Sequence, residues 1–459
     1  MDPIRSFVFL DLEATSCEVS ARPKITELCL VALHRSAVLN PDTRLPRVTD
    51  KLLLAVYPNK PIPGPVCELT GLNNENLTEN ERAVLDANFV AALSGFLQRQ
   101  PPPVGLVAHN GAKFDFPLLK TELMKLNTRL PEGVRFCDSL LAFREADRDC
   151  STGDAPSERV SLSLESLYHR YVSRDPRRAH TAEDDTLALV GVIKARAATL
   201  VPWMDRNFLS WDDIQQMYTP SPVKPGRINN RERTRSPTKL CFTLCLVALH
   251  RSAVLNPDTR LPRVTDKLLL AVYPNKPIPG PVCELTGLNN ENLTENERAV
   301  LDVNFVAALC GFLQRQPPPV GLVAHNGAKF DFPLLKTELM KLNTRLPEGV
   351  RFCDSLLAFR EADRDCSTGD APSERVSLSL ESLYHRYVSR DPRRAHTAED
   401  DALALVGVIK ARAATLVPWM DRNFLSWDDI QQMYTPSPVK PGRINNRERT
   451  RSPTKLCFT

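Results

Sequence analysis

The sequence lacks long apolar runs and closely spaced cysteines. No stretch approaches the roughly 18–20 consecutive apolar residues that span a bilayer, and the N-terminus has no signal-peptide layout. The 12 cysteines are scattered, without a CxxC pair or a zinc-finger spacing to histidines, so we expect most of them to be reduced and buried. These absences argue against membrane, disulfide-rich and zinc-ribbon proteins. They favour a soluble intracellular protein of the nucleus, the cytoplasm or both.

A large excess of one charge is also missing. The 59 basic and 55 acidic residues leave a formal net charge of +4, and the chain is 42% hydrophobic and 25% charged. These proportions are ordinary for a globular protein, and 459 residues suffice for two or three domains with cores of their own.

The chain repeats itself almost completely. Residues 28–243 recur as residues 244–459 at a constant offset of 216, and a repeat of this length is a tandem copy of one globular unit rather than a solenoid. We call residues 1–243 the first copy and residues 244–459 the second copy. A recent duplication and an error in gene assembly both fit. The three differences are Ala87 against Val303, Ser94 against Cys310, and Thr186 against Ala402.

Composition divides the chain into four parts. We expect a complete domain at 1–218, a linker at 219–243, a truncated domain at 244–434 and a tail at 435–459. The linker and the tail are rich in Pro, Arg and Lys, and Glu232 is the one acid of the linker. Such a segment is flexible. It either contacts nucleic acid or directs nuclear import, or it is a solvated connection.

The hydrophobic pattern of the first copy predicts an α/β fold. Residues 6–12 form a nearly continuous apolar run, typical of a strand buried on both faces. Apolar residues at helical spacing mark a helix face within residues 79–100. Strands that first follow one another and then alternate with helices predict a mixed sheet flanked by helices. Further strands are expected at 25–34, 51–57, 104–109 and 134–138, and further helices at 116–126, 162–171 and 181–198.

Two acids end the first expected strand. Asp11 and Glu13 lie two residues apart, so their carboxylates project from the same face. Acids at the tip of a buried strand are costly unless they are neutralised, and Mg²⁺ takes carboxylate oxygens as ligands. By itself, a D-x-E pair is weak evidence for a metal site.

Two further acidic clusters follow along the chain. In VAHNGAKFDFPLL, residues 107–119, Asp115 stands at the start of an expected helix, where a helix N-cap is the simpler interpretation. In AHTAEDDTLALV, residues 179–190, His180 precedes a helix that contains Asp185. A histidine at a helix entrance is more often structural or solvated than catalytic. The neighbouring Asp184 is easily mistaken for the functional acid.

Taken in order, the motifs D-x-E, H-N-x-x-x-x-D and H-x-A-x-x-D resemble those of the DEDDh, or DnaQ-like, 3′→5′ exonucleases. The segments LDLEAT, ELTGL, LVAHNGAKFDFPLL and HTAEDD resemble, more narrowly, the three-prime repair exonucleases of animals. The resemblance covers about residues 7–218 and resumes at Leu244. It implies a ribonuclease-H-like fold that is complete in the first copy and lacks its first strand in the second.

The same resemblance implies a two-metal phosphodiester hydrolase that releases nucleoside 5′-monophosphates. His180 would be the general base. Two Mg²⁺ ions, or Mn²⁺ as an alternative, would be held by Asp11, Glu13, Asp115 and Asp185. Residues implied in substrate binding are Glu13, Ala14, Thr15, Leu69, His109, Asn110, Phe114 and Asp185, with a core phenylalanine as the alternative reading of Phe114.

The substrate implied by the family is single-stranded DNA or a frayed DNA 3′ end. RNA is an alternative substrate, and non-catalytic binding of DNA ends is an alternative function. The family continues its first motif with Gly-Leu, whereas Ser16 and Cys17 stand here, which puts the grip on the substrate end in doubt. The chain has no C-terminal hydrophobic helix and no proline-rich insert at residues 149–160. It therefore resembles the soluble branch, without a membrane partner.

The second copy is expected to be inactive. It retains the equivalents of several motif residues, but nothing in it matches Asp11 or Glu13. Losing that strand removes four large apolar side chains, about 6–12 kcal/mol of burial, and leaves two strand edges unpaired. We therefore expect marginal stability. The retained residues are His325, Asn326, Asp331, His396 and Asp401.

The two copies are expected to associate. Soluble members of the family resemble one another in pairing through an edge strand, and both copies carry the same one. We expect residues 51–57 to pair with residues 267–273, which makes the chain a tethered pseudo-dimer. A homodimer of two chains is the alternative.

Overall fold

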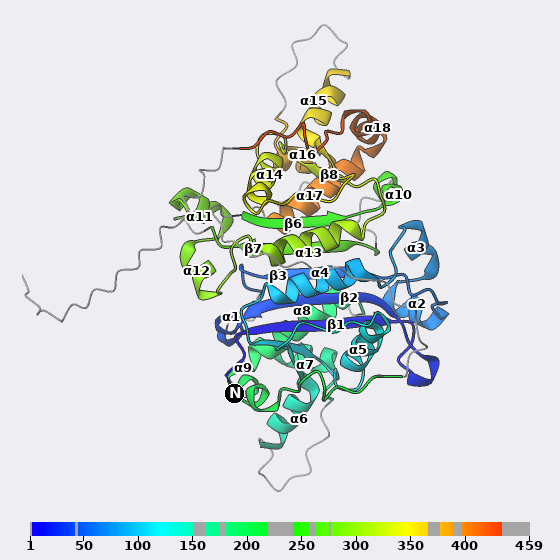
Figure 1. Ribbon diagram of the computed structural model, residues 1–459, viewed down its shortest axis with the longest axis vertical. Helices are drawn as coiled ribbons and strands as arrows, with labels where there is room; N and C mark the ends of the chain where they lie inside the picture. Colours follow the sequence, from blue (N-terminus) through cyan, green and yellow to red (C-terminus); the bar gives the residue numbers. More distant parts are fainter. Residues whose placement is uncertain are drawn as a thin grey trace, which may run out of the picture.

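The computed structural model describes residues 2–41, 45–149, 161–173, 180–218, 242–256, 263–274, 277–365, 377–389 and 397–433. The first copy forms one half of the molecule and the second copy the other half (Figure 1). Residues 150–160, where the sequence has no proline-rich insert, lie outside the described residues, as do nearly all of the expected linker, the tail and His396.

The first copy alternates strands and helices, as its pattern predicts. Its strands are β1 Ser6–Ala14, β2 Ile25–His34, β3 Asp50–Ala55, β4 Val104–Ala108 and β5 Arg135–Asp138. Its helices are the 3-10 turn η1 Val19–Ala21, α1 Arg35–Leu39, α2 Gly64–Thr70, α3 Asn74–Glu79, α4 Ala87–Gln98, α5 Asp115–Lys125, α6 Ser139–Asp149, α7 Leu164–Tyr171, α8 Ala182–Ala195 and α9 Ala197–Asn207.

In its described residues, the second copy repeats these elements from β2 onward, without counterparts of β1 and η1. Its strands are β6 Phe242–Ala248, β7 Asp266–Val272, β8 Gly321–Ala324 and β9 Arg351–Asp354. β6 begins two residues inside the segment expected to be linker. Its helices are α10 Arg251–Leu255, α11 Gly280–Thr286, α12 Asn290–Glu295, α13 Val303–Gln314, α14 Asp331–Lys341, α15 Ser355–Asp365, α16 Leu380–Tyr387, α17 Ala398–Ala411 and α18 Ala413–Asn423.

One seven-stranded sheet runs through both copies in the order β5-β4-β1-β2-β3-β7-β6. Within it, β1 pairs antiparallel with β2 and parallel with β4, and β4 pairs parallel with β5. Helices flank this sheet (Figure 1). The mixed α/β fold that the sequence predicts is confirmed.

β1 is the central strand of the first copy. Phe7, Val8, Phe9 and Leu10 are all 0% exposed, because neighbouring strands cover both edges of β1 and helices cover both faces. Val8 and Leu10 enter one hydrophobic core, while Phe7 and Phe9 enter the other, on the opposite side of the sheet. This two-sided burial explains why the strand reads as an apolar run.

Two helix predictions need correction. The helix expected at 181–198 is two helices, α8 and α9, that meet at 105°. The helix expected within 79–100 begins only at Ala87, because the Asp86 side chain caps it by accepting from the backbone N–H of Phe89. Within the described residues, no single helix has the length and apolarity to cross a membrane. Two bent pairs, α8 with α9 and α17 with α18, meet those criteria jointly.

The two copies join edge to edge. β3 pairs antiparallel with β7, with Leu52 opposite Leu268, inside the two segments expected to pair. Helices α4 and α13 cross over this seam (Figure 1). Glycine permits their close approach, because a Cβ on Gly95 would stand 2.5 Å from the backbone nitrogen of Ala308.

Buried charges on both copies neutralise one another at the seam. The Asp50 carboxylate lies 3.2 Å from Arg298 and 3.3 Å from Arg99. These guanidinium groups hold the pKa of Asp50 below its usual value, although burial alone would raise it. Asp266 repeats the arrangement with Arg82, at 3.3 Å. Pairs of this kind set register and orientation, since an unpaired charge here would be strongly destabilising.

A second ionic cluster joins β3 and β7 to α8 and α17. Lys51 Nζ lies 3.0 Å from Glu183 and 2.8 Å from Glu399. Lys267 Nζ lies 2.7 Å from Glu183. The two lysines lower the pKa of Glu183 to about 2 against the opposing effect of burial. Helix α8 is therefore anchored by lysines from both copies.

The missing strand divides the sheet of the second copy. Among the described strands, β6 pairs only with β7, and β8 pairs only with β9 in a separate two-stranded sheet. β2 is buried along nine of its ten residues, whereas Thr243–Ala248 of β6 are half-buried. The two unpaired edges expected from the sequence are present.

Candidate active site

The D-x-E pair lies at the end of β1, next to the first turn of α8. Asp11 is opposite Cys29 in the ladder with β2, Glu13 is opposite Glu27, and the register shifts directly after Glu13. α8 packs against both strands and brings Asp185 to the pair. Ligand oxygens of Asp11, Glu13 and Asp185 lie within 4.8 Å of one another, close enough to share one cation.

Asp115 joins the cluster from α5. It is 5% exposed, and the backbone N–H of Leu12 donates to its carboxylate, which places it against β1 between the two strand acids. Its charge is one of those that raise the pKa of Asp11. The N-cap interpretation of Asp115 is wrong, because Phe114 holds the cap position and makes no side-chain cap hydrogen bond.

Loop geometry brings His180 to the same helix end. Its φ of 70° is left-handed, and its backbone N–H donates to Asp185 Oδ2 at 3.2 Å. The side chain is exposed. The actual cap of α8 is Thr181, whose hydroxyl accepts from Asp184 N and contacts the Asp184 carboxylate at 2.9 Å. Asp184 is thus occupied at the cap, whereas Asp185 faces the other acids.

The acids are poised for a cation. Burial, reinforced by the surrounding carboxylates, raises the pKa of Asp11 well above its usual value. Burial, with Glu27 and Asp185, raises the pKa of Glu13 to about 8. Burial also raises the pKa of Asp115 to about 7. Hard oxygen donors in mutual repulsion fit Mg²⁺ or Mn²⁺, since a divalent charge offsets both the burial and the repulsion.

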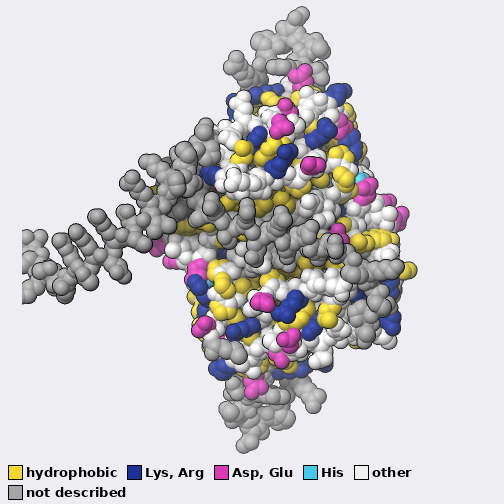
Figure 2. Space-filling view, viewed as in Figure 1, with side chains coloured by type: hydrophobic (Ala, Val, Ile, Leu, Met, Phe, Trp, Pro, Cys, Tyr) yellow, Lys and Arg dark blue, Asp and Glu magenta, His cyan; other side chains and the backbone are white. Residues whose placement is uncertain are grey.

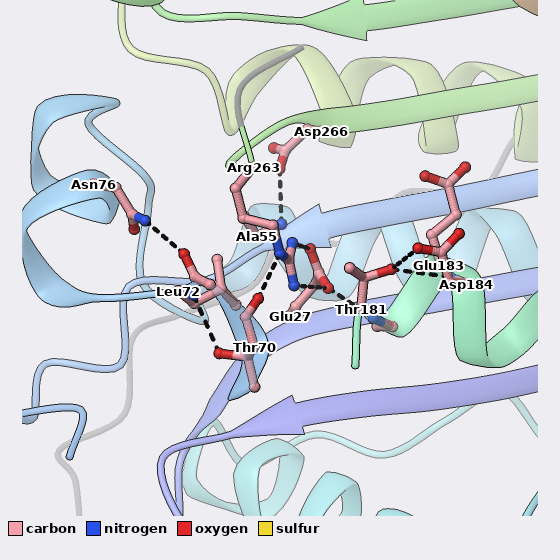
Figure 3. Close-up of polar contacts among 12 residues, drawn as sticks. Glu27, Ala55, Thr70, Leu72, Asn76, Thr181, Glu183, Asp184, Arg263 and Asp266 are labelled. Atoms are coloured by element: carbon pink, nitrogen blue, oxygen red, sulfur yellow. Dashed lines mark hydrogen bonds and ion pairs between the residues drawn. The ribbon is translucent and has the colours of Figure 1, made fainter. Parts of the chain in front are cut away.

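The second copy contributes a cation to this site. Glu27, 1% exposed, accepts from Ala182 N at the start of α8 at 2.9 Å. Arg263 of the second copy binds both oxygens of Glu27, with Nη2 2.9 Å from Oε2, and donates to Thr70 O at 2.7 Å (Figure 3). Its charge also lowers the pKa of Glu13. Sequence reasoning missed both residues, although Glu27 is an unusual acid within an apolar run.

Comparison with known proteins decides the family. No protein-family model matches the chain. Over 221 residues it is 43% identical to three prime repair exonuclease 2 of Mus musculus, which covers 47% of this chain and 93% of that relative. Over 225 residues it is 40% identical to three-prime repair exonuclease 1 of Bos taurus, covering 47% of this chain and 71% of the relative. The chain belongs to the three-prime repair exonuclease family. The resemblance inferred from the motifs is confirmed at this level.

Two solved structures to which the chain is similar are more distant than these family members. Cell-death related nuclease 4 is 14% identical with a TM-score of 0.33, covering 43% of this chain and 64% of that one. Exonuclease I of E. coli in complex with a dA16 oligonucleotide is 14% identical with a TM-score of 0.34, covering 44% and 42%. These likenesses are weak.

In this member of the exonuclease family, His109 and Asn110 have visible structural partners. The His109 ring lies 2.9 Å from Ser139 Oγ and 2.8 Å from Leu162 O, so it links β4 to the segments beyond it. Asn110 has a left-handed φ of 63°, and its N–H donates to Asp138 at 2.9 Å. His325 repeats the His109 contacts in the second copy.

The remaining residues implied in substrate binding differ in how exposed they are. Leu69, 55% exposed at the end of α2, is available for contact, whereas Phe114 is partly buried and packs on the core. Thr15 is buried, and its hydroxyl accepts from Lys24 N at 3.1 Å. Ala14 is buried beside it.

Ser16 and Cys17, the two positions that depart from the family pattern, come directly after Thr15 in the chain. Ser16 Oγ accepts from Glu18 N at 3.0 Å, and Cys17 is exposed. The serine hydroxyl therefore holds the local turn, and Cys17 has room for contact with a ligand.

The counterpart site in the second copy is open and incomplete. Asp331 is exposed and Asp401 half-buried, while their first-copy equivalents face the acids of β1. Although the residue as a whole is exposed, partial desolvation of its carboxyl raises the pKa of Asp331 to about 6, below the value of about 7 for the buried Asp115. Asn326 donates its N–H to Asp354 Oδ1 at 2.9 Å, and His396 lies outside the described residues.

Removing divalent metal should make stability fall as pH rises. The folded-state pKa of Glu13, about 8, lies above its usual 4.5, so the folded state keeps this proton longer and loses stability as pH rises through 8. We expect the free energy of unfolding in EDTA to fall by about 3 kcal/mol between roughly pH 5 and 8. Added Mg²⁺ should abolish the fall, because it binds only the folded cluster. Thermal melts across this range measure both effects; a flat EDTA curve would contradict the proposed burial of these acids.

Proposed function

We propose that the chain is a Mg²⁺-dependent 3′→5′ exodeoxyribonuclease that removes nucleoside 5′-monophosphates from single-stranded or frayed DNA ends. The convergence of Asp11, Glu13 and Asp185 is the observation that carries this proposal. These acids come from two separated segments, and Asp115 adds a third. The names of the relatives, three prime repair exonucleases, support the polarity and the reaction class.

The residues of the chain divide the chemistry among them. When bound, a pair of divalent cations stabilises charge on the attacking and leaving oxygens of the phosphodiester. Asp11, Glu13, Asp115 and Asp185 are the residues that would hold them. His180 stays in solvent at the edge of the cluster, where its imidazole can accept the proton of an attacking water. Its left-handed backbone is held by the hydrogen bond from its N–H to Asp185, which is one of the acids.

Substrate recognition relies on stacking and backbone contacts. Leu69 offers an exposed apolar surface, and the half-buried ring of Phe114 can stack on a base without sequence preference. The Ala14–Thr15 backbone at the strand end is close to the acids. We assign the activity to the first copy and its domain to residues 1–218, because the second copy lacks the D-x-E strand.

The direct test uses 5′-labelled single-stranded DNA and RNA of one sequence, with Mg²⁺, Mn²⁺ or EDTA. We expect a ladder of labelled chains shortened from the 3′ end and the release of unlabelled mononucleotides. We also expect faster loss of DNA than of RNA, and no reaction in EDTA. A faster reaction on RNA would overturn the substrate assignment. Tight binding of DNA ends without cleavage in either metal would overturn the enzymatic assignment.

A further inference from the structure

Among the described residues, no strand of the second copy takes the place that β1 has in the first copy. β6 and β8, the counterparts of its neighbours β2 and β4, are the two sides of this vacant position, and we call it the acceptor groove. In the first copy the same two walls, β2 and β4, are buried along almost their whole length. In the second copy, Thr243–Ala248 and Leu322–Ala324 are half-buried, and Gly321 is exposed.

Side chains around the acceptor groove are uncovered in the same pattern. Leu405 and Val406 on α17 are half-buried, whereas their counterparts Leu189 and Val190 are 1% exposed. Asp331 at the start of α14 is exposed. The residues of β6, β8 and α17 around the groove are therefore mainly apolar. The acid at its end is Asp331, the counterpart of Asp115 beside β1.

Within the described residues, backbone groups along the groove also lack strand partners. In the described part of the chain, the outer edge of β6 and the outer edge of β8 carry no further strand. A single extended segment between them would pair with both edges at once. Exposed strand edges recruit peptides in this way, with main-chain bonds giving affinity and side-chain positions giving selectivity.

We propose that the acceptor groove binds an extended peptide segment with the chemistry of Ser6–Ala14, inserted parallel to β8 and antiparallel to β6. The first copy identifies this occupant, because walls of identical sequence close there around that strand. The repeat offset sets the register. Phe9 of the peptide lies opposite Val247 and Val323, and Leu10 lies opposite Leu246.

The occupant must come from another polypeptide. The chain's own β1 is the central strand of the first copy, with Phe7 and Phe9 fully buried, so using it would dismantle that core. A suitable donor presents a nine-residue strand, apolar on both faces, that ends in D-x-E. A second chain could donate its β1 only by opening its own first copy.

Insertion would bring two carboxylates beside Asp331 and Asp401. The occupied groove would then carry four acids in the arrangement of the first copy, with Thr243 in place of Glu27. This consequence rests on the proposed nuclease function, whereas binding of the strand does not. Occupancy would convert the second copy into a second acidic site.

The binding test uses a fluorescent synthetic peptide of residues 4–16 and the full chain. We expect saturable anisotropy, and slower hydrogen exchange confined to β6 and β8. A peptide of the same composition in scrambled order should not bind. Leu246→Asp should abolish binding, while Leu357→Asp, at an exposed position on α15, should not. Absence of saturable binding, or protection elsewhere in the chain, would overturn the proposal.

The activity test uses the double variant Asp11→Asn/Asp115→Asn, in which strand exchange into the first copy cannot restore its acids. We expect the peptide to restore Mg²⁺-dependent release of nucleotides, and the further change Asp331→Asn to remove it. Binding without rescue would contradict only the rebuilt site. Self-association of the chain that the peptide cannot compete away would show a second chain as the occupant and would overturn the proposal.

Discussion

Asp115→Asn should lower nucleotide release by more than about 100-fold, and Asp331→Asn should leave it unchanged. The two residues are repeat equivalents, so the comparison replaces the same carboxyl group by an amide in each copy. Only Asp115 lies beside Asp11, because β1 exists only in the first copy. Losing a buried ligand should cost at least as much as losing a residue that supports one, which is typically 10–100-fold.

Initial rates at saturating single-stranded DNA, measured across a Mg²⁺ titration, provide the measurement. Asp11→Asn, which has no counterpart in the second copy, serves as the reference for a dead site. Equal damage from Asp331→Asn would mean that the second copy contributes to catalysis without a donated strand. Thermal melts of each variant separate loss of ligand from loss of fold.

Arg263→Ala should lower the activity of the first copy and shift it to higher pH, while Arg47→Ala should do neither. Arg263 binds the buried Glu27 and also lowers the pKa of Glu13. Removing one partner of a buried ion pair costs about 3–5 kcal/mol, because the remaining charge is uncompensated. Without Arg263, Glu13 holds its proton to higher pH, and metal must compete with that proton.

Arg47 is the matched control for this change. It donates to Thr286 O at 2.7 Å, as Arg263 does to Thr70 O at the same distance. Thr243 stands at the position of Glu27 in the second copy, so the contact of Arg263 with an acid at that position is not repeated by Arg47. Arg263→Lys should restore part of the activity, because a cation is kept while the two-point contact is lost. Equal pH profiles for the Arg263→Ala and Arg47→Ala variants would contradict this role.

The sequence predicted most of the first copy because its strands are buried on both faces and read as apolar runs. Strands β1, β2, β4 and β5 match their expected positions within about two residues. The break between α8 and α9 was missed, because the apolar pattern continues through it. Short helices such as α2 and α3 were missed too, since one or two turns leave too little periodicity to detect.

The spacing of the motifs identified candidate site residues, whereas the fold shows which residues surround each of them. Asp11 and Glu13 share a face because a strand has a period of two, which can be read from the letters. His109 is held by Ser139 and Leu162, so its visible role is structural, and Phe114 lies partly in the core. No local sequence pattern distinguishes a histidine or phenylalanine with a structural role from one that contacts substrate.

The sequence alone determined the tandem repeat, the absence of a D-x-E strand in the second copy, and the three acidic motifs, because each is a property of order along the chain. The sequence had already led us to expect the pairing of residues 51–57 with residues 267–273. Only the tertiary structure showed that Arg263 reaches Glu27 and that Arg298 pairs with Asp50 across the seam between the copies. These contacts join residues more than 200 positions apart. They depend on how edges and faces pack in space, which no local pattern encodes.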